Sequence, residues 1–380
     1  MKLFFKNILS LLGLFYLIDL IRKIRFFHYR HHFPYLKIGF IKGRVRKVNR
    51  PEIDQNLLVS LVDSINKDLD YSATSQWSEI FDSYQSEAVS SLRNKDTKKL
   101  LKLLRNPLKN NLQYGFDNLS KVLQSPFRIE TLYEVKSTAD HFVALAEFLN
   151  FQKYISPEGL VSPIKKKLDV NALVKEIVQK YFPDNFTFPN PYLGEKGIFT
   201  PYGIASLRVP AAIYQAIQVR KFGDNICEIG PGLGRTAYFA KLLGAKIYTL
   251  VDLPISSLSQ GYFLGSSLPN EAFCFNGQNI KINDGFKFHQ PKNFIKCRDK
   301  YDVVLNVDSL TEIGFDTARD YLKNLIGKSE FFFSINHEGN EFCIKDIISE
   351  FPNYKLISKC RSWVRQGYVE ELYKISTEKK

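Results

Sequence analysis

The chain has 380 residues, of which 44% are hydrophobic and 24% are charged, as in globular proteins rather than in disordered or collagen-like chains. Its five cysteines are an odd number and form no C-x-x-C pair, which argues against a disulfide framework or a zinc site and for reduced thiols in the cytoplasm. The formal net charge is +14, but residues 1–50 hold twelve basic residues against Asp19 alone, so they carry +11 and the other 330 residues only +3.

Residues 1–50 are predicted to attach the chain to a membrane. Residues 8–21 are strongly apolar apart from Asp19, yet they are fewer than the roughly 20 residues that span a bilayer. No small-residue cleavage site follows them, which argues against a secretory signal. We expect peripheral attachment to the anionic inner membrane face, or an N-terminal anchor in it, with the body of the protein in the cytoplasm. The alternative is a buried helix with a solvated basic face. Nucleic acid is not expected as a partner, because no recognised binding module accompanies the charge.

Residues 51–196 are predicted to form a helical region that serves as a lid or acceptor-binding part. Apolar residues recur there at spacings of three and four, and Ser, Asp or Thr residues near the segment starts offer helix caps. The expected helices cover residues 57–69, 78–92, 97–106, 138–155 and 173–182. Residues 183–197 then contain three prolines and two glycines, which marks the clearest boundary of the chain.

Residues 198–223 are predicted to form a short loop and a helix that leads into the next segment. Their position just before a glycine-rich turn places Tyr202 and Arg208 near a ligand, and we expect both to contact the acceptor substrate. Ordinary helix packing is the alternative for both side chains.

Residues 225–254 have the pattern of a complete strand, glycine turn, helix and second strand. A short apolar run that includes Glu228 ends in the turn at residues 230–234, where glycines let the backbone turn sharply and approach a ligand. Residues 235–243 have helical spacing, and a β-rich run at 246–251 stops at Asp252. This pattern is typical of a nucleotide-binding βαβ unit.

The glycine spacing of this unit differs from the G-x-G-x-x-G of dinucleotide-binding proteins. Residues 228–234 read E-x-G-x-G-x-G, and Asp252 follows Gly234 by eighteen residues. Through these residues the chain resembles the class I S-adenosylmethionine-dependent methyltransferases. The resemblance implies S-adenosylmethionine as the cofactor, with its methionine portion over the glycine turn and its ribose hydroxyls on Asp252. It also implies a set of cofactor-binding residues: Glu228, Gly230, Gly232, Gly234, Asp252, Leu253 and Asn306.

The resemblance implies a fold as well, an α/β, Rossmann-like seven-stranded methyltransferase sheet in residues 197–380. The later sequence agrees, because strand and helix signals alternate along it. Further strands are expected at residues 272–275, 301–307, 330–336, 354–358 and 367–376, the last two as an antiparallel pair, with a helix at 318–326. Ligands bind beyond the carboxyl ends of such strands. The candidate positions there are Asn306, Asp308, Ser309, Asn336, His337 and Glu338.

A narrower resemblance covers roughly residues 75–380. The segments WSEI (77–80), TPYGIASLR (200–208), DLP (252–254) and SLTEI (309–313) are similar to those of sugar O-methyltransferases found with genes for bacterial polysaccharides and glycosylated natural products. Pro231 departs from the small residue expected in the turn. The resemblance implies methyl transfer to a sugar or glycan hydroxyl on a free, nucleotide-linked or lipid-linked acceptor. Two alternatives are a polyketide or lipid acceptor and a non-catalytic scaffold of a glycan-assembly complex.

Methyl transfer to a hydroxyl requires alignment of donor and acceptor and a base that takes the hydroxyl proton. His337 is the first candidate for this base, because its ordinary pKa is near 6.5 and it leaves a strand on the cofactor side. Glu312 and Asp308 are alternatives, which could instead orient the base or hold sugar hydroxyls. A divalent metal is possible but not indicated: Asp308, Glu312 and Glu338 offer oxygen ligands without forming a compact acidic motif.

Overall fold

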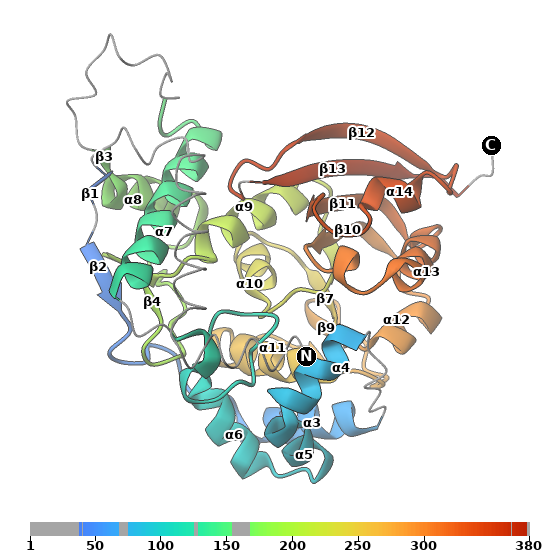
Figure 1. The fold of residues 1–380 in the computed structure, drawn as a ribbon, viewed down its shortest axis with the longest axis horizontal. Coiled ribbons are helices and arrows are strands. Elements are labelled where there is room, and N and C mark those ends of the chain that lie inside the picture. Colours follow the sequence, from blue (N-terminus) through green and yellow to red (C-terminus); the bar gives the residue numbers. More distant parts are fainter. Residues whose placement is uncertain are drawn as a thin grey trace. The chain divides into compact units, whose positions relative to one another are not determined.

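The computed structural model describes residues 38–39, 41–67, 75–124, 128–153, 168–365 and 367–377 (Figure 1). The chain forms two compact units. Unit 1 comprises Met1–Arg44, Gln124–Phe186 and Lys196–Leu207, and unit 2 comprises Val45–Leu123, Thr187–Glu195 and Arg208–Lys380. Residues 51–196 therefore contribute to both units, and the apolar residues 8–21 lie outside the described residues. No helix of the described part combines the length and apolarity that crossing a bilayer requires.

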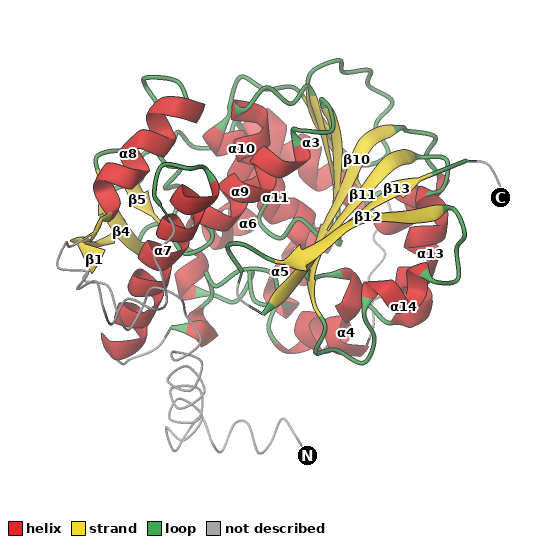
Figure 2. Cartoon of the chain, turned by 90° about the horizontal axis from the view of Figure 1, so that it is seen from above, coloured by secondary structure: helices red, strands yellow, loops and turns green. Residues whose placement is uncertain are grey.

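Unit 2 is built on a sheet of eight strands, and strands of the sheet are drawn in yellow in Figure 2. The strands are β6 (Asn225–Ile229), β7 (Ile247–Val251), β8 (Phe273–Cys274), β9 (Gly285–His289), β10 (Tyr301–Val307), β11 (Ser329–His337), β12 (Tyr354–Arg361) and β13 (Tyr368–Ile375). Their order is β12-β13-β11-β10-β6-β7-β9-β8, and every neighbouring pair is parallel except the two pairs that include β13. The predicted α/β, Rossmann-like sheet is confirmed, with eight strands rather than seven.

The strand that the sequence did not predict is β9. Its five residues alternate, with Phe286 and Phe288 buried and Lys287 and His289 partly exposed. Five residues are too few for an alternating pattern to stand out in a sequence. The other seven strands lie where they were expected.

Helices alternate with the strands of this sheet along the chain and pack on it. They are α9 (Val209–Val219), α10 (Arg235–Leu242), α11 (Pro254–Ser267), α12 (Pro291–Lys296), α13 (Phe315–Leu325) and α14 (Ile344–Ile348). One buried apolar cluster joins α12, α13 and α14 to the sheet through residues such as Phe294, Leu322, Ile347, Val304 and Phe332. Burial of this cluster fixes β10 and β11, whose carboxyl ends carry the candidate site, against a rigid support.

The N-terminal helices of unit 2 are α3 (Gln55–Asn66), α4 (Ser75–Ser83), α5 (Ser86–Arg93) and α6 (Thr97–Arg105), followed by the short helices η1 (Pro107–Lys109) and η2 (Lys121–Leu123). Helices α3 and α6 have caps of the predicted kind, since Asp54 accepts a hydrogen bond from Leu57 N–H and Asp96 accepts one from Lys99 N–H. The helix predicted at residues 78–92 is instead two helices, α4 and α5. The chain breaks beside Gln85, whose buried amide donates to backbone carbonyls of the segment after η1.

Helix α3 packs against α11 at two glycines. A Cβ atom on Gly261 would lie 2.4 Å from a methyl group of Leu61, and a Cβ atom on Gly265 would lie 2.9 Å from a methyl group of Leu57. Residues four apart lie on one face of a helix, so the two glycines form a flat strip on which α3 rests. This close approach would not be available to larger residues.

Unit 1 contains α7 (Arg128–Phe148) and α8 (Val170–Tyr181), a parallel pair of β1 (Ile38–Gly39) with β3 (Leu168–Asp169), and an antiparallel sheet of β2 (Ile41–Arg44), β4 (Lys196–Thr200) and β5 (Gly203–Ala205). The loop expected before α9 is therefore partly a hairpin. Helix α7 also begins and ends earlier than the predicted 138–155, because Phe148 is followed by a turn that includes Asn150 in a left-handed conformation.

Candidate functional site

The glycine turn after β6 requires glycine for two reasons. Gly230, Gly232 and Gly234 have φ angles of +68°, +59° and +84°, which other residues adopt only at a cost. In addition, a Cβ atom on Gly230 would lie 2.2 Å from the hydroxyl of Ser309, and one on Gly232 would lie 3.2 Å from the carbonyl oxygen of Phe116. Because these three positions of the turn carry no side chain, a ligand can approach the backbone at the carboxyl end of β6.

Gly230→Ala is expected to lower the free energy of unfolding by about 2–4 kcal/mol, the sum of a left-handed backbone and a clash with Ser309. Chemical denaturation measures this change. Gly277→Ala is the matched control, because Gly277 has a φ of +72° but no atom within 4 Å of an added Cβ. It should lose only about 1 kcal/mol. Equal losses in the two variants would contradict the role given to Ser309.

The side chain of Glu228, on β6, is buried. It is 2% exposed, and the hydroxyl of Tyr248 on β7 donates a hydrogen bond of 2.6 Å to its carboxylate. Burial raises the pKa of Glu228 to about 8. Its side chain thus links neighbouring strands beneath the turn, and its predicted contact with the cofactor stays a prediction.

Asp252 lies at the end of β7, and donors from α11 and the residue before it hold its carboxylate. Its carboxylate accepts a hydrogen bond of 2.7 Å from the N–H of Leu253, the residue that precedes α11, and another of 2.7 Å from the side-chain amide of Gln260. Burial raises the pKa of Asp252 to about 7. Because each carboxylate oxygen can accept more than one hydrogen bond, both oxygens keep capacity for a ligand.

Gln260 is a site residue that the sequence analysis missed. The amide nitrogen that donates to Asp252 also donates to the carbonyl oxygen of Gly232, at 2.9 Å. It therefore fixes the glycine turn relative to the acidic residue. No sequence motif includes Gln260. Only its position, about two turns into the helix that follows Asp252, could have indicated that it lies at the site.

Asn306 and Asn336 tie the carboxyl ends of three strands together. Asn306 is fully buried, donates to the carbonyl oxygen of Ile229 at 3.0 Å and accepts from Asn336 at 2.9 Å. The hydroxyl of Ser309 donates to the same Ile229 carbonyl at 3.0 Å. These contacts give Asn306 a structural role in β10, and its contact with a cofactor stays a prediction.

The structure brings the three catalytic candidates together at the exits of β10 and β11. One side-chain nitrogen or oxygen atom from each of Asp308, Glu312 and His337 lies within 4.8 Å of those of the other two. His337 Nε2 is 3.4 Å from Asp308 Oδ1, and the N–H of Gly339 donates to His337 Nδ1 at 3.2 Å. In the neutral ring, Nε2 therefore carries the proton and directs it at Asp308.

Two further residues of this cluster, Arg365 and Tyr368, were not predicted. Arg365 Nη2 lies 3.1 Å from Asp308 Oδ2, and the hydroxyl of Tyr368 donates to the same oxygen at 2.6 Å. The Arg365 guanidinium also stacks 3.7 Å from the centroid of the Tyr368 ring. Asp308 is thus contacted by His337, Arg365 and Tyr368, its Oδ1 keeps capacity for a further hydrogen bond, and its backbone has a left-handed conformation with a φ of +60°.

Glu312 has a different environment from Asp308. It ends the short helix η3 (Leu310–Glu312), and within the described chain no hydrogen bond or ion pair joins its carboxylate to another residue. Burial, followed by the charge of Asp308, raises its pKa to about 7. A partly buried carboxylate with this pKa and no partner can take a proton from a ligand near neutral pH.

Arg208 and Tyr202, the predicted acceptor residues, fall in different units. Arg208 precedes α9 in unit 2. Burial lowers the pKa of Arg208, the charge of Arg365 lowers it further, and the charge of Asp117 opposes this shift. Tyr202 lies in the β4–β5 turn of unit 1, where its N–H donates to the hydroxyl of Thr200 at 3.1 Å. The contact of Tyr202 with an acceptor stays a prediction.

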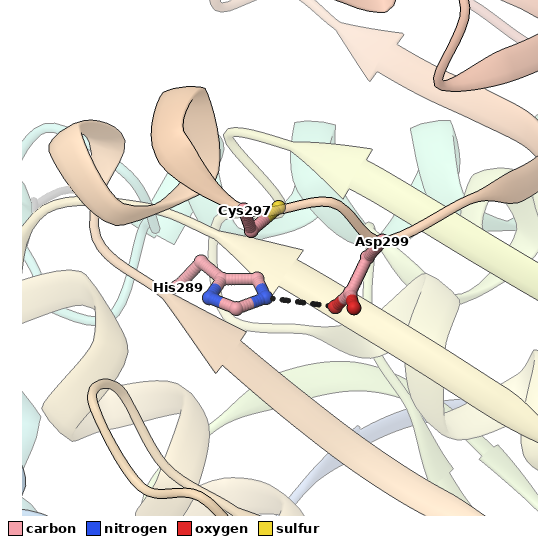
Figure 3. Close-up of side chains that lie close together, drawn as sticks. All are labelled: His289, Cys297 and Asp299. Atoms are coloured by element: carbon pink, nitrogen blue, oxygen red, sulfur yellow. Dashed lines mark hydrogen bonds and ion pairs between the residues drawn. The ribbon is translucent and has the colours of Figure 1, made fainter.

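A second cluster is formed by His289, the last residue of β9, and by Cys297 and Asp299, which lie in the segment between α12 and β10 (Figure 3). His289 Nε2 is 3.2 Å from Asp299 Oδ2, and this contact, with Lys287 nearby, lowers the pKa of Asp299 to about 2. Lys287 Nζ is 3.4 Å from Asp299, and Lys328 Nζ is 3.9 Å from Cys297 Sγ. Two ammonium groups beside these atoms oppose a divalent cation, so the cluster acts as an ion-pair network.

No protein-family model matches the chain, and no curated protein matches it in sequence. Among solved structures it is similar to magnesium protoporphyrin IX methyltransferase from Synechocystis PCC 6803, with 14% identity, a TM-score of 0.33 and coverage of 44% of this chain and 77% of that chain. It is also similar to the glycopeptide N-methyltransferase MtfA, complexed with S-adenosyl-L-homocysteine, with 12% identity, a TM-score of 0.34 and coverage of 44% and 90%.

A third similar structure is a ribosomal protein L11 methylase from Lactobacillus delbrueckii subsp. bulgaricus, with 12% identity, a TM-score of 0.31 and coverage of 46% of this chain and 81% of that chain. Identities and TM-scores this low do not assign a family to the chain.

Proposed function

We propose that the chain is an S-adenosylmethionine-dependent O-methyltransferase that acts on a sugar or glycan hydroxyl. The main observation behind the proposal is that the glycine turn after β6 lies close to Asp252 after β7. The side-chain amide of Gln260 donates a hydrogen bond to each of them. The turn is a suitable support for the methionine portion of the donor. The ionised carboxylate of Asp252 accepts hydrogen bonds from the two ribose hydroxyls.

In the proposed reaction, the acceptor hydroxyl lies beside Glu312. Its oxygen attacks the sulfonium methyl carbon, so that the new C–O bond forms while the C–S bond breaks and S-adenosylhomocysteine leaves. The hydroxyl proton passes to the carboxylate of Glu312. Glu312 suits this role better than His337, because the Nδ1 lone pair of His337 accepts from Gly339 and its Nε2–H faces Asp308. His337 and Arg365 hold Asp308, which accepts a hydrogen bond from a second acceptor hydroxyl.

A sugar acceptor fits a site with several carboxylate and imidazole groups close together, since adjacent sugar hydroxyls need acceptors and donors at short spacing. The acceptor is nucleotide-linked or lipid-linked, and the basic residues 1–50 hold the enzyme at the anionic inner face of the membrane where such acceptors are assembled. Flotation of the full-length protein with anionic vesicles tests this attachment. A protein that stays at the bottom of the gradient at low salt would exclude it.

Asp252→Ala is expected to weaken the binding of S-adenosylhomocysteine about 100-fold, because two hydrogen bonds to a charged acceptor are lost. Isothermal titration calorimetry measures this affinity. Asp320→Ala, an exposed carboxylate on α13, is the matched control and should bind like the wild type. No binding by the wild type, or equal binding by Asp252→Ala, would exclude the methyl-donor site. Binding without turnover of nucleotide sugars or glycolipids would favour a scaffold.

The affinity for S-adenosylhomocysteine is expected to rise with pH and to level off above about pH 7. Asp252 must be ionised to accept both ribose hydroxyls, and its pKa in the free protein is about 7. Below that value the affinity should fall about tenfold per pH unit, since binding then requires the loss of a proton. Titrations between pH 5.5 and about 8.5 test this. Asp252→Asn should bind weakly with a flat profile, and a flat profile in the wild type would contradict the assignment.

A further inference from the structure

Residues 110–121 form a compact loop of unit 2, which we call the cover loop, and its two ends lie together. The N–H of Lys121 donates to the carbonyl oxygen of Asn110 at 2.6 Å and closes the loop. Inside it, the N–H of Leu119 donates to a carboxylate oxygen of Asp117 at 3.2 Å. Such hydrogen bonds let a loop keep one shape without regular secondary structure. The cover loop therefore presents its backbone to its neighbours in a fixed arrangement.

The cover loop meets the glycine turn after β6 at two points. The carbonyl oxygen of Phe116 would lie only 3.2 Å from a Cβ atom on Gly232, so the two backbones approach each other closely. The carboxylate of Asp117 pairs with Arg235, the residue directly after the turn, and these side chains are 4% and 10% exposed. Because water screens such a buried ion pair only weakly, the pair holds the loop against the turn.

The carbonyl oxygen of Phe116 is a hydrogen-bond acceptor that no protein group uses. Within the part of the chain that the structure describes, no N–H or O–H group donates to it. Phe116 is half-buried, and Gly232 beside it has no side chain that could cover this oxygen. A carbonyl oxygen only accepts hydrogen bonds, so a ligand that lies on the turn must supply the donor.

We propose that the carbonyl oxygen of Phe116 accepts a hydrogen bond from the ammonium group of the methyl donor's amino-acid portion. This inference rests on the proposed function, which places that portion over the glycine turn. An ammonium group suits the position because it has three N–H donors and a positive charge that strengthens the hydrogen bond. Asp117 is a positioning residue, which fixes the preceding carbonyl group through its pair with Arg235 and does not touch the donor.

The role of the ammonium group is tested by removing it from the ligand. Isothermal titration calorimetry with the full-length protein compares S-adenosylhomocysteine with its deaminated analogue, in which hydrogen replaces the amino group. Wild-type protein should bind the analogue at least about tenfold more weakly, because a charge-assisted hydrogen bond is lost. Equal affinity for the two compounds would overturn the proposal.

Asp117→Asn tests the positioning of the carbonyl group. The variant removes the charge that holds the cover loop to Arg235, so it should bind S-adenosylhomocysteine about tenfold more weakly than the wild type. Its affinity for 5′-methylthioadenosine, which lacks the whole amino-acid portion, should not change. Asp320→Asn, an exposed carboxylate on α13, is the matched control and should bind both compounds like the wild type. Equal weakening of both compounds in Asp117→Asn would mean general damage to the site and would contradict the role given to Asp117.

Hydrogen exchange of the wild type gives a readout without any substitution. Bound S-adenosylhomocysteine should slow amide exchange in residues 112–119, and the bound deaminated analogue should slow it less, since only the first compound ties down the cover loop. If neither S-adenosylhomocysteine nor 5′-methylthioadenosine bound the wild type, the proposed function would be rejected and this inference with it. If both bound, but neither affinity nor exchange depended on the amino group, only the inference would be rejected.

Discussion

Arg235→Ala is expected to lower the free energy of unfolding by about 3–5 kcal/mol, because it removes the cation that pairs with two buried carboxylates. Arg235 begins α10, directly after the glycine turn, and its guanidinium pairs with Asp117 and, at 3.0 Å, with Glu195. The three side chains are between 4% and 10% exposed. Although burial alone would lower the pKa of Arg235, the two carboxylates raise it above its ordinary value, so the arginine stays charged.

The position of Arg235 in the helix makes the pairing necessary. A cation in the first turn of a helix is unfavourable, because the N-terminal end already carries partial positive charge. Asp117 and Glu195 come from segments far from α10 in the sequence and supply negative charge at that end. The network therefore joins the glycine turn to both segments, and its loss should loosen all three.

Chemical denaturation of Arg235→Ala measures this loss. Arg319→Ala, which removes an exposed ion pair with Glu350, is the matched control and should lose much less stability. A charge-free variant, Arg235→Met with Asp117→Asn and Glu195→Gln, should recover much of the stability, since no buried charge then lacks a partner. If Arg235→Ala lost no more than Arg319→Ala, the buried network would not stabilise the turn.

Glu312→Gln is expected to lower kcat about 10²- to 10⁴-fold, the range typical for loss of a general base. Glutamine keeps the size of the side chain but cannot take the hydroxyl proton. The affinity for S-adenosylhomocysteine should stay within about twofold of the wild type, because Asp252 and the glycine turn are untouched. Turnover is measured with an acceptor found in the screen of nucleotide sugars and glycolipids.

The pH dependence of kcat distinguishes Glu312 from His337. The base must be ionised, so kcat in the wild type should rise with pH through an apparent pKa near 7 and then level off. His337→Gln should keep this rise and lose less activity, whereas Glu312→Gln should lose the rise altogether. Glu341→Gln, an exposed control, should behave like the wild type. The opposite pattern, with the rise lost in His337→Gln, would make His337 the base.

The parts of this structure that could be predicted from sequence are those set by local patterns. The glycine turn, the strand before it and the position of Asp252 follow from residue spacing within a single βαβ unit. Asp308, Glu312 and His337 could be placed together because the carboxyl ends of neighbouring parallel strands meet at one edge of a sheet. That rule needs only the strand assignments, which the long apolar runs made clear.

The residues that escaped prediction are brought to the site by tertiary packing. Arg365 lies between β12 and β13, and Tyr368 is the first residue of β13. Asp117 comes from a segment about 120 residues before the helix it stabilises. Their partners depend on how distant segments fold back, which no periodicity encodes. Gln260 lies in a helix that holds several other polar residues, such as Ser256 and Ser259, so its polar side chain does not stand out in the sequence. Which ring nitrogen of neutral His337 carries the proton likewise depends on the N–H of Gly339, and this backbone contact cannot be read from a sequence.

The glycine strip of α11 gives α3 a mechanical role at a distance from the methyl donor. Gly261 follows Gln260, and successive residues of a helix point about 100° apart, so the face that rests on α3 determines where the Gln260 amide points. Any change that rotates or tilts α11, such as a larger side chain opposite Gly261, would swing that amide away from Asp252 and from Gly232. Leu57 and Leu61 thus fix the orientation of α11, and the geometry of the proposed ribose site depends on residues that do not line it.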